Sequence, residues 1–177
     1  IPGPSKCTNA ARSDRTPEAG RVGVPALLIH APCMPPDVRA RCHHVVGLGM
    51  NGAEMAANAQ LTDHVVHSLN DDPTLPYADE SFDIALCTVS VQYLLHPIEV
   101  FTEVRRVLRP GGQFILSFSN RCFPTKAIRG WLHLDEEQRM QVVSAYFALS
   151  GGFGPVRGQL RTTPGPGDPL YAVWASR

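Results

Sequence analysis

Apolar and polar residues alternate along this chain in blocks that predict strands and helices in turn. Short runs that are mostly apolar predict buried strands at 26–30, 43–49, 63–69, 82–94 and 113–119. Segments in which apolar residues recur every three or four positions predict helices at 51–61, 96–109 and 134–150. Two further runs, 155–163 and 169–176, are separated by the turn sequence PGPGD and predict an antiparallel hairpin at a sheet edge.

The segment 96–112 has the clearest start and stop signals. Pro97 suits the first turn of a helix, where its missing N–H costs nothing. Phe101, Val104 and Leu108 share one face, and the Pro-Gly-Gly at 110–112 ends the helix. We therefore expect 82–94 and 113–119 to be neighbouring parallel strands joined by this helix.

Strands that alternate with helices predict an α/β domain with a doubly wound, mostly parallel sheet, followed by a C-terminal antiparallel hairpin. We expect one such domain over residues 26–177. Residues 1–25 are rich in Pro, Gly, Ser and charged residues, so we expect an extended arm that a partner chain holds in place.

The composition excludes several classes of function. The 177 residues carry 16 basic and 16 acidic residues, so the chain lacks the basic excess of a nucleic-acid-binding protein. No window has the roughly 18 consecutive apolar residues of a membrane span. The densest group of potential metal ligands, Cys42-His43-His44, lies on a predicted strand where neighbours point to opposite faces, so we expect no metal site.

The five cysteines are odd in number and scattered, which favours free thiols in a reducing intracellular compartment. Residues 1–25 are too polar for a secretory signal. They are compatible with the start that remains after a transit peptide is removed. We therefore expect a mitochondrial or chloroplast location.

Three motifs at fixed spacing mark the middle of the chain. They are Leu-Pro-Tyr at 75–77, Ser-Phe-Asp at 81–83 and Arg-Val-Leu-Arg-Pro-Gly-Gly at 106–112. In these motifs the chain resembles the class I S-adenosylmethionine-dependent methyltransferases of the type 11 branch. The resemblance implies a Rossmann-like fold whose final strand is reversed, as the predicted hairpin also suggests.

The resemblance also implies three cofactor contacts, and the sequence departs from each. A glycine-rich turn should follow the first strand, but residues 30–36 contain three prolines and no glycine. An acid for the ribose hydroxyls should end the second strand, where Met50 and Asn51 stand. An acid for the adenine amino group is expected near Ser68, and Asp71 and Asp72 come a few residues later. We therefore expect a degenerate site and no cofactor.

Candidate site residues follow the predicted strand ends, where open α/β sheets bind ligands. If S-adenosylmethionine is retained, five residues after the second and third strands would hold it: Gly49, Asn51, Ser68, Leu69 and Asn70. Gln92 and Tyr93 are the candidates on the substrate side.

The stretch after the fifth strand mixes bases with aromatic residues, as protein interfaces do. Its candidate partner-surface residues are Arg121, Phe123, Lys126, Arg129 and Trp131. The alternative is a loop that caps the pocket.

Two functions fit these observations. The weakened cofactor contacts favour a catalytically inactive methyltransferase-like domain that serves as an accessory or scaffolding subunit of a larger assembly, bound to other protein subunits. The alternative is an active S-adenosylmethionine-dependent methyltransferase that acts on a small molecule.

Overall fold

The structure, a computed structural model, describes residues 24–29, 34–162 and 167–177. The arm expected at 1–25 lies outside this part except for its last two residues. Pro25 already belongs to the first strand, and the Val24 N–H donates to the Arg41 carbonyl oxygen at 3.1 Å. Within the described residues, the folded domain therefore begins before residue 26.

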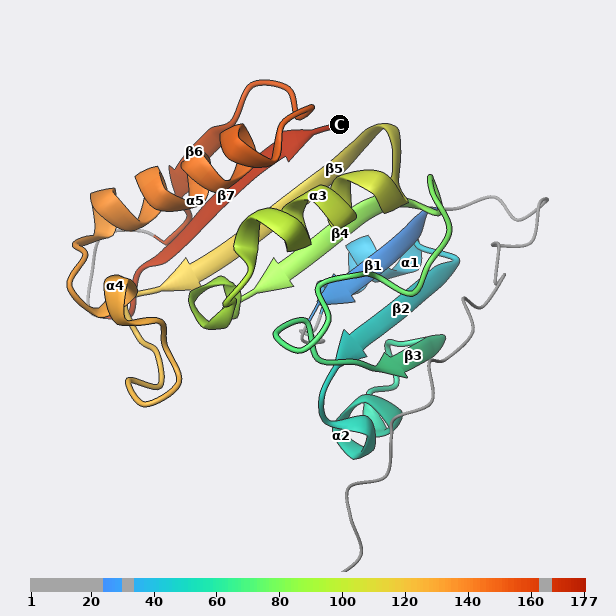
Figure 1. Ribbon diagram of the computed structural model, residues 1–177. Coiled ribbons are helices and arrows are strands. Elements are labelled where there is room, and N and C mark those ends of the chain that lie inside the picture. The colour runs from blue at the N-terminus through green and yellow to red at the C-terminus, as the bar shows by residue number, and fades with distance from the viewer. Residues whose placement is uncertain (1–23, 30–33, 163–166) are drawn as a thin grey trace, which may run out of the picture.

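Seven strands form one sheet in the order β3-β2-β1-β4-β5-β7-β6 (Figure 1). The strands are β1 (Pro25–Ile29), β2 (His44–Gly49), β3 (Asp63–Val66), β4 (Phe82–Thr88), β5 (Leu108–Ser119), β6 (Arg157–Leu160) and β7 (Leu170–Ser176). The first five run parallel, and β7 pairs antiparallel with both β5 and β6. The predicted parallel sheet with a C-terminal hairpin is confirmed, including the parallel pairing of β4 and β5.

Helices cover both faces of the sheet, although unevenly. They are α1 (Pro36–Ala40), α2 (Gly52–Ala57), the 3-10 helix η1 (Val91–Tyr93), α3 (Pro97–Val107), α4 (Arg129–Leu132) and α5 (Glu136–Ser150). The two long helices, α3 and α5, lie side by side across β4, β5 and β7, whereas the short α1 lies behind β1 and β2 (Figure 1). The main core therefore lies beneath α3 and α5.

Alternation along the buried strands divides the core into two parts. Leu27 and Ile29 of β1 belong to the larger cluster, while Ala26 and Leu28, one residue out of phase, belong to a smaller cluster on the other face. The larger cluster contains Phe101, Phe114 and Phe147, whose rings pack edge to face with centroids 4.9–5.5 Å apart. The helix-spaced positions of α3 and α5 thus lock the helices onto the sheet.

The apolar run 82–94 is not one strand, as its composition suggested. β4 ends at Thr88, because Val89 adopts a left-handed conformation with φ of 51°. This conformation is rare for a β-branched residue and stores on the order of 1–3 kcal/mol of strain. It turns the chain into η1 across the end of the sheet, so the second half of the run is a 3-10 helix.

Three other elements differ from the sequence predictions. The helix expected at 96–109 ends at Val107, and residues 108–112 already belong to β5, which was expected to begin at residue 113. The proline-rich segment after β1, in which we anticipated no helix, contains α1, with Pro36 at its first position. The four-residue α4 was also not anticipated.

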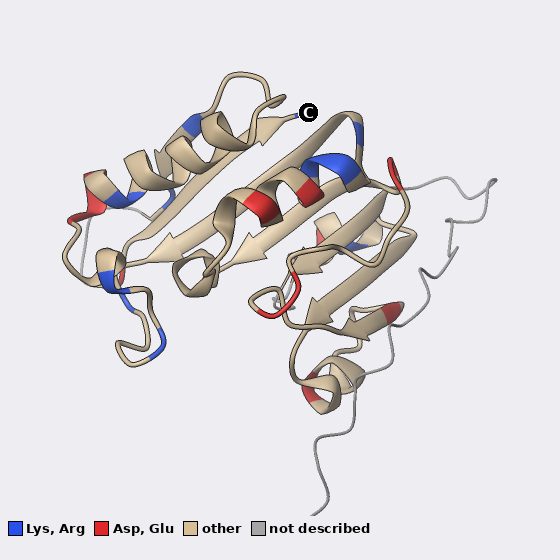
Figure 2. Cartoon of the chain, in the orientation of Figure 1, with Lys and Arg blue, Asp and Glu red and all other residues tan. Residues whose placement is uncertain are grey.

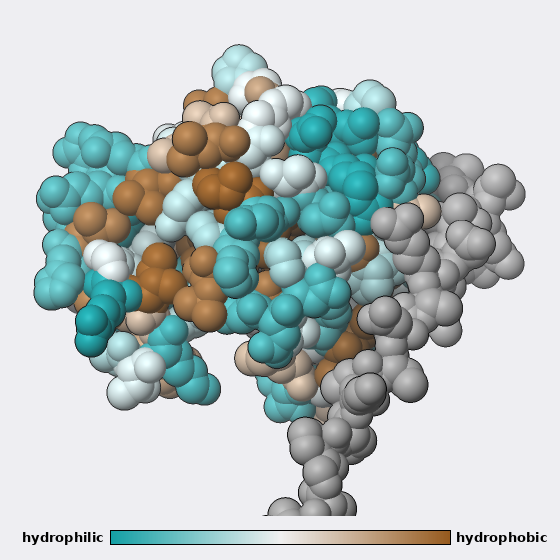
Figure 3. Space-filling view, viewed as in Figure 1, coloured by the Kyte–Doolittle hydropathy of each residue, from teal (hydrophilic) through white to brown (hydrophobic). Residues whose placement is uncertain are grey.

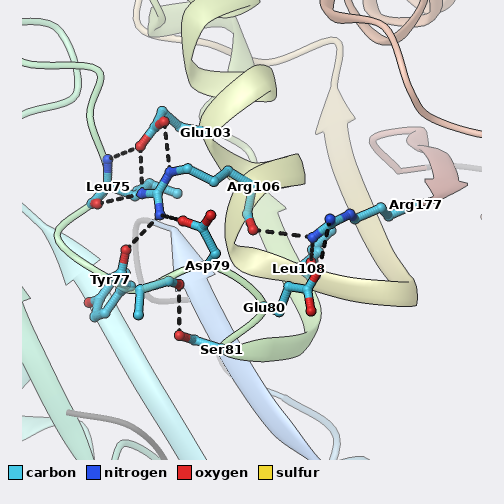
Figure 4. Close-up of polar contacts among 10 residues, drawn as sticks. Leu75, Tyr77, Asp79, Glu80, Ser81, Glu103, Arg106, Leu108 and Arg177 are labelled. Carbon is cyan, nitrogen blue, oxygen red and sulfur yellow. Dashed lines mark hydrogen bonds and ion pairs between the residues drawn. The ribbon is translucent and has the colours of Figure 1, made fainter. Parts of the chain in front are cut away.

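The three sequence motifs converge at the amino edge of the sheet, where β4 and β5 begin (Figure 4). The Arg106 guanidinium donates to the carbonyl oxygens of Leu75 and Tyr77 at 3.0 and 2.8 Å. It also forms ion pairs with Asp79 and Glu103, each at 2.7 Å. Hydrogen bonds to Glu103 raise the pKa of Arg106 above its ordinary value. One side chain of α3 thus fixes the loop that leads into β4.

The Pro-Gly-Gly motif belongs to the same structure. Gly111 has φ of 82°, which favours glycine. A Cβ on Gly112 would lie 2.9 Å from the Arg109 carbonyl oxygen and 3.0 Å from that of Asp83. The C-terminal residue Arg177 exchanges backbone hydrogen bonds with this turn and pairs with Glu80 at 2.9 Å. The residues of these motifs therefore stabilise the fold at the amino edge of the sheet, which is the edge opposite the carboxyl ends of the parallel strands.

Candidate functional site

A pocket of about 600 Å³ opens at the carboxyl edge of the sheet. It is lined by residues that follow β2, β3, β4 and β5. The described lining residues are Gly49, Met50, Asn51, Glu54, Met55, Ser68, Leu69, Asn70, Tyr93, Leu94, Leu95, Phe123 and Lys126. Figure 3 shows the surface hollowed at this edge, between the loop after β5 and the region of α2. Ligands of open α/β sheets bind at this edge.

Apolar side chains form both the floor and the rim of the pocket. The buried side chains of Met55, Leu69 and Leu94 form the floor. At the rim, Met50 is 65% exposed, Leu95 62% and Phe123 68%. An apolar cavity with a few polar groups is the usual composition of a small-molecule site.

Two polar lining residues, Asn51 and Glu54, lie at the start of α2. Asn51 caps α2, and its side-chain oxygen accepts from the Glu54 N–H at 3.2 Å. The Asn51 amide also donates to the Glu54 carboxylate at 3.3 Å. Glu54 is the only acidic residue among the described lining residues. The pair offers oxygen acceptors to a ligand with hydroxyl donors.

Two side chains tie the walls together. The Asn70 side chain donates to the Tyr93 carbonyl oxygen and accepts from the Leu95 N–H, each at 2.9 Å. The Tyr93 hydroxyl accepts from the Phe123 N–H at 2.9 Å. Asn70, Tyr93 and Phe123 therefore link the segments after β3, β4 and β5 in one hydrogen-bonded chain. Such cross-links hold the pocket walls in a fixed arrangement.

The strained turn at Val89 supports this wall from beneath. The Val89 N–H donates to the Ser117 carbonyl oxygen at 2.7 Å, and its own carbonyl oxygen accepts from the Gln92 side chain at 3.0 Å. The Gln92 carbonyl oxygen accepts from the Ile128 N–H at 3.0 Å. These hydrogen bonds of the turn therefore fix the position of η1 at the carboxyl edge of the sheet.

The pocket brings together the cofactor-side candidates of the sequence. All five of them line it: Gly49, Asn51, Ser68, Leu69 and Asn70. Of the two substrate-side candidates, Tyr93 lines the pocket and Gln92 does not. Gln92 is 1% exposed and turned into the core, because a 3-10 helix directs neighbouring side chains differently from the strand that we expected. Gln92 is thus a support of the wall and not a substrate contact.

The partner-surface candidates separate in the structure. Phe123 and Lys126 line the pocket, whereas Arg121 pairs with Asp168 at 2.6 Å and Arg129 is exposed on α4. Trp131 is 1% exposed, and its ring packs edge to face on Phe118, so it cannot belong to a surface. The capping-loop alternative fits Phe123 and Lys126 better than a continuous partner surface.

Sequence reasoning missed five lining residues: Met50, Glu54, Met55, Leu94 and Leu95. Glu54 lies within α2 and not at the end of a strand, where the sequence candidates were sought. Its place in the first turn, next to the Asn51 cap, was the signal that it would face the same edge as the strand end. Met50 and Leu95 are apolar residues beside turns, a pattern that also occurs at sites without function.

Residues 33–116 match the protein family model described as "Methyltransferase domain". The malonyl-(acyl-carrier protein) O-methyltransferase of Marinomonas sp. (strain MWYL1) is 26% identical over 110 residues, which cover 62% of this chain and 41% of that protein. A ubiquinone/menaquinone biosynthesis C-methyltransferase of Roseobacter denitrificans is 39% identical over 72 residues, which cover 40% of this chain and 28% of that protein. The chain thus spans less than half the length of these curated relatives.

Solved structures show the same fold. A SAM-dependent methyltransferase of Archaeoglobus fulgidus superposes with a TM-score of 0.61 at 10% identity, over 88% of this chain and 86% of that chain. With the family match, this confirms the resemblance to class I S-adenosylmethionine-dependent methyltransferases. In the described part of the chain, no helix has the length and apolar character needed to span a membrane.

Proposed function

We propose that this chain, which has the class I methyltransferase fold, is an S-adenosylmethionine-dependent methyltransferase domain that acts on a small molecule. The observation that carries the proposal is the pocket, because one cavity at the carboxyl edge gathers the five residues expected on the cofactor side. The names of the relatives support the reaction class, since both are methyltransferases and act in small-molecule biosynthesis or on a carrier-bound acid.

The lining residues fit the adenosyl part of S-adenosylmethionine. Leu69 and Leu94 offer an apolar surface for a flat ring. Glu54 and Asn51 offer carboxylate and amide oxygens for two neighbouring hydroxyl donors, which compensates for the missing acid at the end of β2. When bound, S-adenosylmethionine supplies an activated methyl group.

The remaining wall residues would orient an acceptor and exclude water. Asn70 and Tyr93 hold the segments after β3, β4 and β5 at fixed separation, so an acceptor between them has a defined approach. The exposed Leu95 and Phe123 side chains are free to fold over a bound molecule and shield it from solvent.

A second function, an accessory subunit that no longer uses the cofactor, is favoured by one observation. Gly49 ends β2, so the residue that follows the strand carries no carboxylate, and the nearest acid is Glu54 on α2. In this case the pocket is a remnant, and protein partners bind elsewhere on the domain.

Isothermal titration calorimetry of the full chain with S-adenosylhomocysteine separates the two functions. The methyltransferase proposal predicts one site with a dissociation constant of about 100 μM or tighter. Glu54→Gln should weaken binding about tenfold, because hydrogen bonds to a charged acceptor contribute more than neutral ones. Glu99→Gln on the exposed side of α3 is the matched control. Absence of binding at about 1 mM would favour the accessory subunit.

A further inference from the structure

Among the described lining residues, the two charged ones lie on different elements. Glu54 is on α2, and Lys126 is on the loop after β5. Lys126 is the only basic residue among the described lining residues. Figure 2 shows the basic positions of the loop after β5 and the acidic position of α2 at separate places along this edge. The pocket therefore has an acidic side and a basic side.

The Lys126 ammonium group is placed beside an exposed ring. Its nitrogen lies 5.8 Å from the centroid of the Phe123 ring. Among the described residues Lys126 forms no ion pair, whereas the neighbouring Arg121 is paired with Asp168. Of the two bases, Lys126 is thus the one whose charge is available to an incoming anion.

The surface next to this charge is apolar. Phe123, Leu95 and Met50 expose more than half of their side chains around the same opening. Exposed apolar groups that cluster around a cavity and are bordered by polar residues mark binding sites. A ligand that used both features would carry an apolar body and a negative group next to it.

We infer that the basic side of the pocket binds a small organic anion: an apolar ring or chain packs on Met50, Leu95 and Phe123, and its carboxylate or comparable anionic group pairs with Lys126. That this molecule is the methyl acceptor rests on the proposed function, but its binding does not require the cofactor. The carboxylate of Glu54, on α2, repels anions, so a second anion is disfavoured on that side of the pocket.

The test uses two fluorescent probes of similar shape. One is 8-anilinonaphthalene-1-sulfonate, which is apolar and anionic, and the other is N-phenyl-1-naphthylamine, which lacks the sulfonate. We expect saturable binding of both probes to the full chain. Lys126→Glu should weaken binding of the anionic probe at least tenfold and change the affinity for the neutral probe less than twofold. Phe123→Ala should weaken both probes.

The control variant is Arg129→Glu, which makes the same change of charge at an exposed position outside the pocket. The inference is overturned if Arg129→Glu weakens the anionic probe as much as Lys126→Glu, if Lys126→Glu weakens both probes equally, or if neither probe saturates. Titration with S-adenosylhomocysteine is a separate measurement. A chain that binds the anionic probe through Lys126 and not the nucleoside would retain this site and lose the proposed function.

Discussion

The two edges of the sheet differ in how strongly the sequence specifies them. The amino edge contains all three motifs, and each has a structural reason: Arg106 binds the Leu-Pro-Tyr loop, Asp83 of Ser-Phe-Asp forms an ion pair with Arg109, and the Pro-Gly-Gly turn leaves no room for a Cβ at Gly112. The carboxyl edge contains the pocket, and no motif marks it. Its features are single residues such as Glu54 and Tyr93 at the ends of different elements.

The difference between the edges explains why the sequence of this chain indicates its fold more clearly than its function. The residues that carry the family resemblance lie in the turn at the start of β5 and in the loop before β4, where backbone geometry restricts what is tolerated. Ligand contacts depend on side chains at the opposite edge, which can be exchanged without loss of the sheet. Departures at the carboxyl edge therefore say less about folding than about which ligand is bound.

The largest expected effect comes from the amino edge. Arg106→Gln removes two ion pairs and leaves the carbonyl oxygens of Leu75 and Tyr77 without their donor. We expect the free energy of unfolding to fall by about 3 kcal/mol, since broken charged networks that are partly buried leave polar groups unsatisfied. Urea unfolding followed by circular dichroism measures it. A loss below about 0.5 kcal/mol, the level expected for the exposed control Arg129→Gln, would remove the structural role.

The pH dependence of stability tests how completely Cys87, in the central strand β4, is buried. Burial raises the pKa of the Cys87 thiol from 9.0 to about 11. The thiolate is disfavoured only in the folded chain, so the unfolded chain loses this proton first above pH 9. The free energy of unfolding should therefore fall by about 2 kcal/mol between pH 9 and 11 through this group. Cys87→Ala should flatten the plot of unfolding free energy against pH over that range. An unchanged slope in this variant would contradict the prediction.

A smaller effect is expected at the carboxyl edge. Asn70→Ala removes two hydrogen bonds that join the segments after β3 and β4. We expect a loss of about 1–2 kcal/mol in stability and weaker binding of S-adenosylhomocysteine, because the walls are no longer held together. The comparison is with Asn58→Ala, whose side chain bonds only locally to Gln60. Equal effects on binding would show that Asn70 does not organise the pocket.

The smallest expected effect is that of Tyr93→Phe. It removes the hydroxyl that accepts from the Phe123 N–H. Because this N–H is exposed, a water molecule can accept its hydrogen bond instead. We expect stability to change by less than about 1 kcal/mol. Binding of the anionic naphthalene probe should fall a few fold, because Phe123 is less well positioned. A stability loss as large as that of Asn70→Ala would place Tyr93 among the structural residues.

Most of the fold could be predicted from the sequence, because the parallel pairing of β4 with β5, the C-terminal hairpin and the start of α3 rest on strong local signals such as Pro97 and the buried strands. The end of β4 could not, since nothing in an apolar run announces that Val89 takes a positive φ. The pocket candidates after β2 and β3 were found from the strand ends together with the cofactor contacts that the family resemblance implies. Gln92 and Trp131 were misplaced because the directions of their side chains, in a 3-10 helix and in the short helix α4, are set by packing.

The most direct test of the account compares S-adenosylhomocysteine binding in one variant from each edge. Ser68→Tyr fills the pocket, and Arg106→Gln loosens the motif network. Titrations are run well below the unfolding temperature of the weaker variant. The account predicts that the wild-type chain binds, that Ser68→Tyr weakens binding at least tenfold with little change in stability, and that Arg106→Gln changes binding less than twofold. Equal losses of affinity in both variants, or no binding by the wild-type chain, would contradict it.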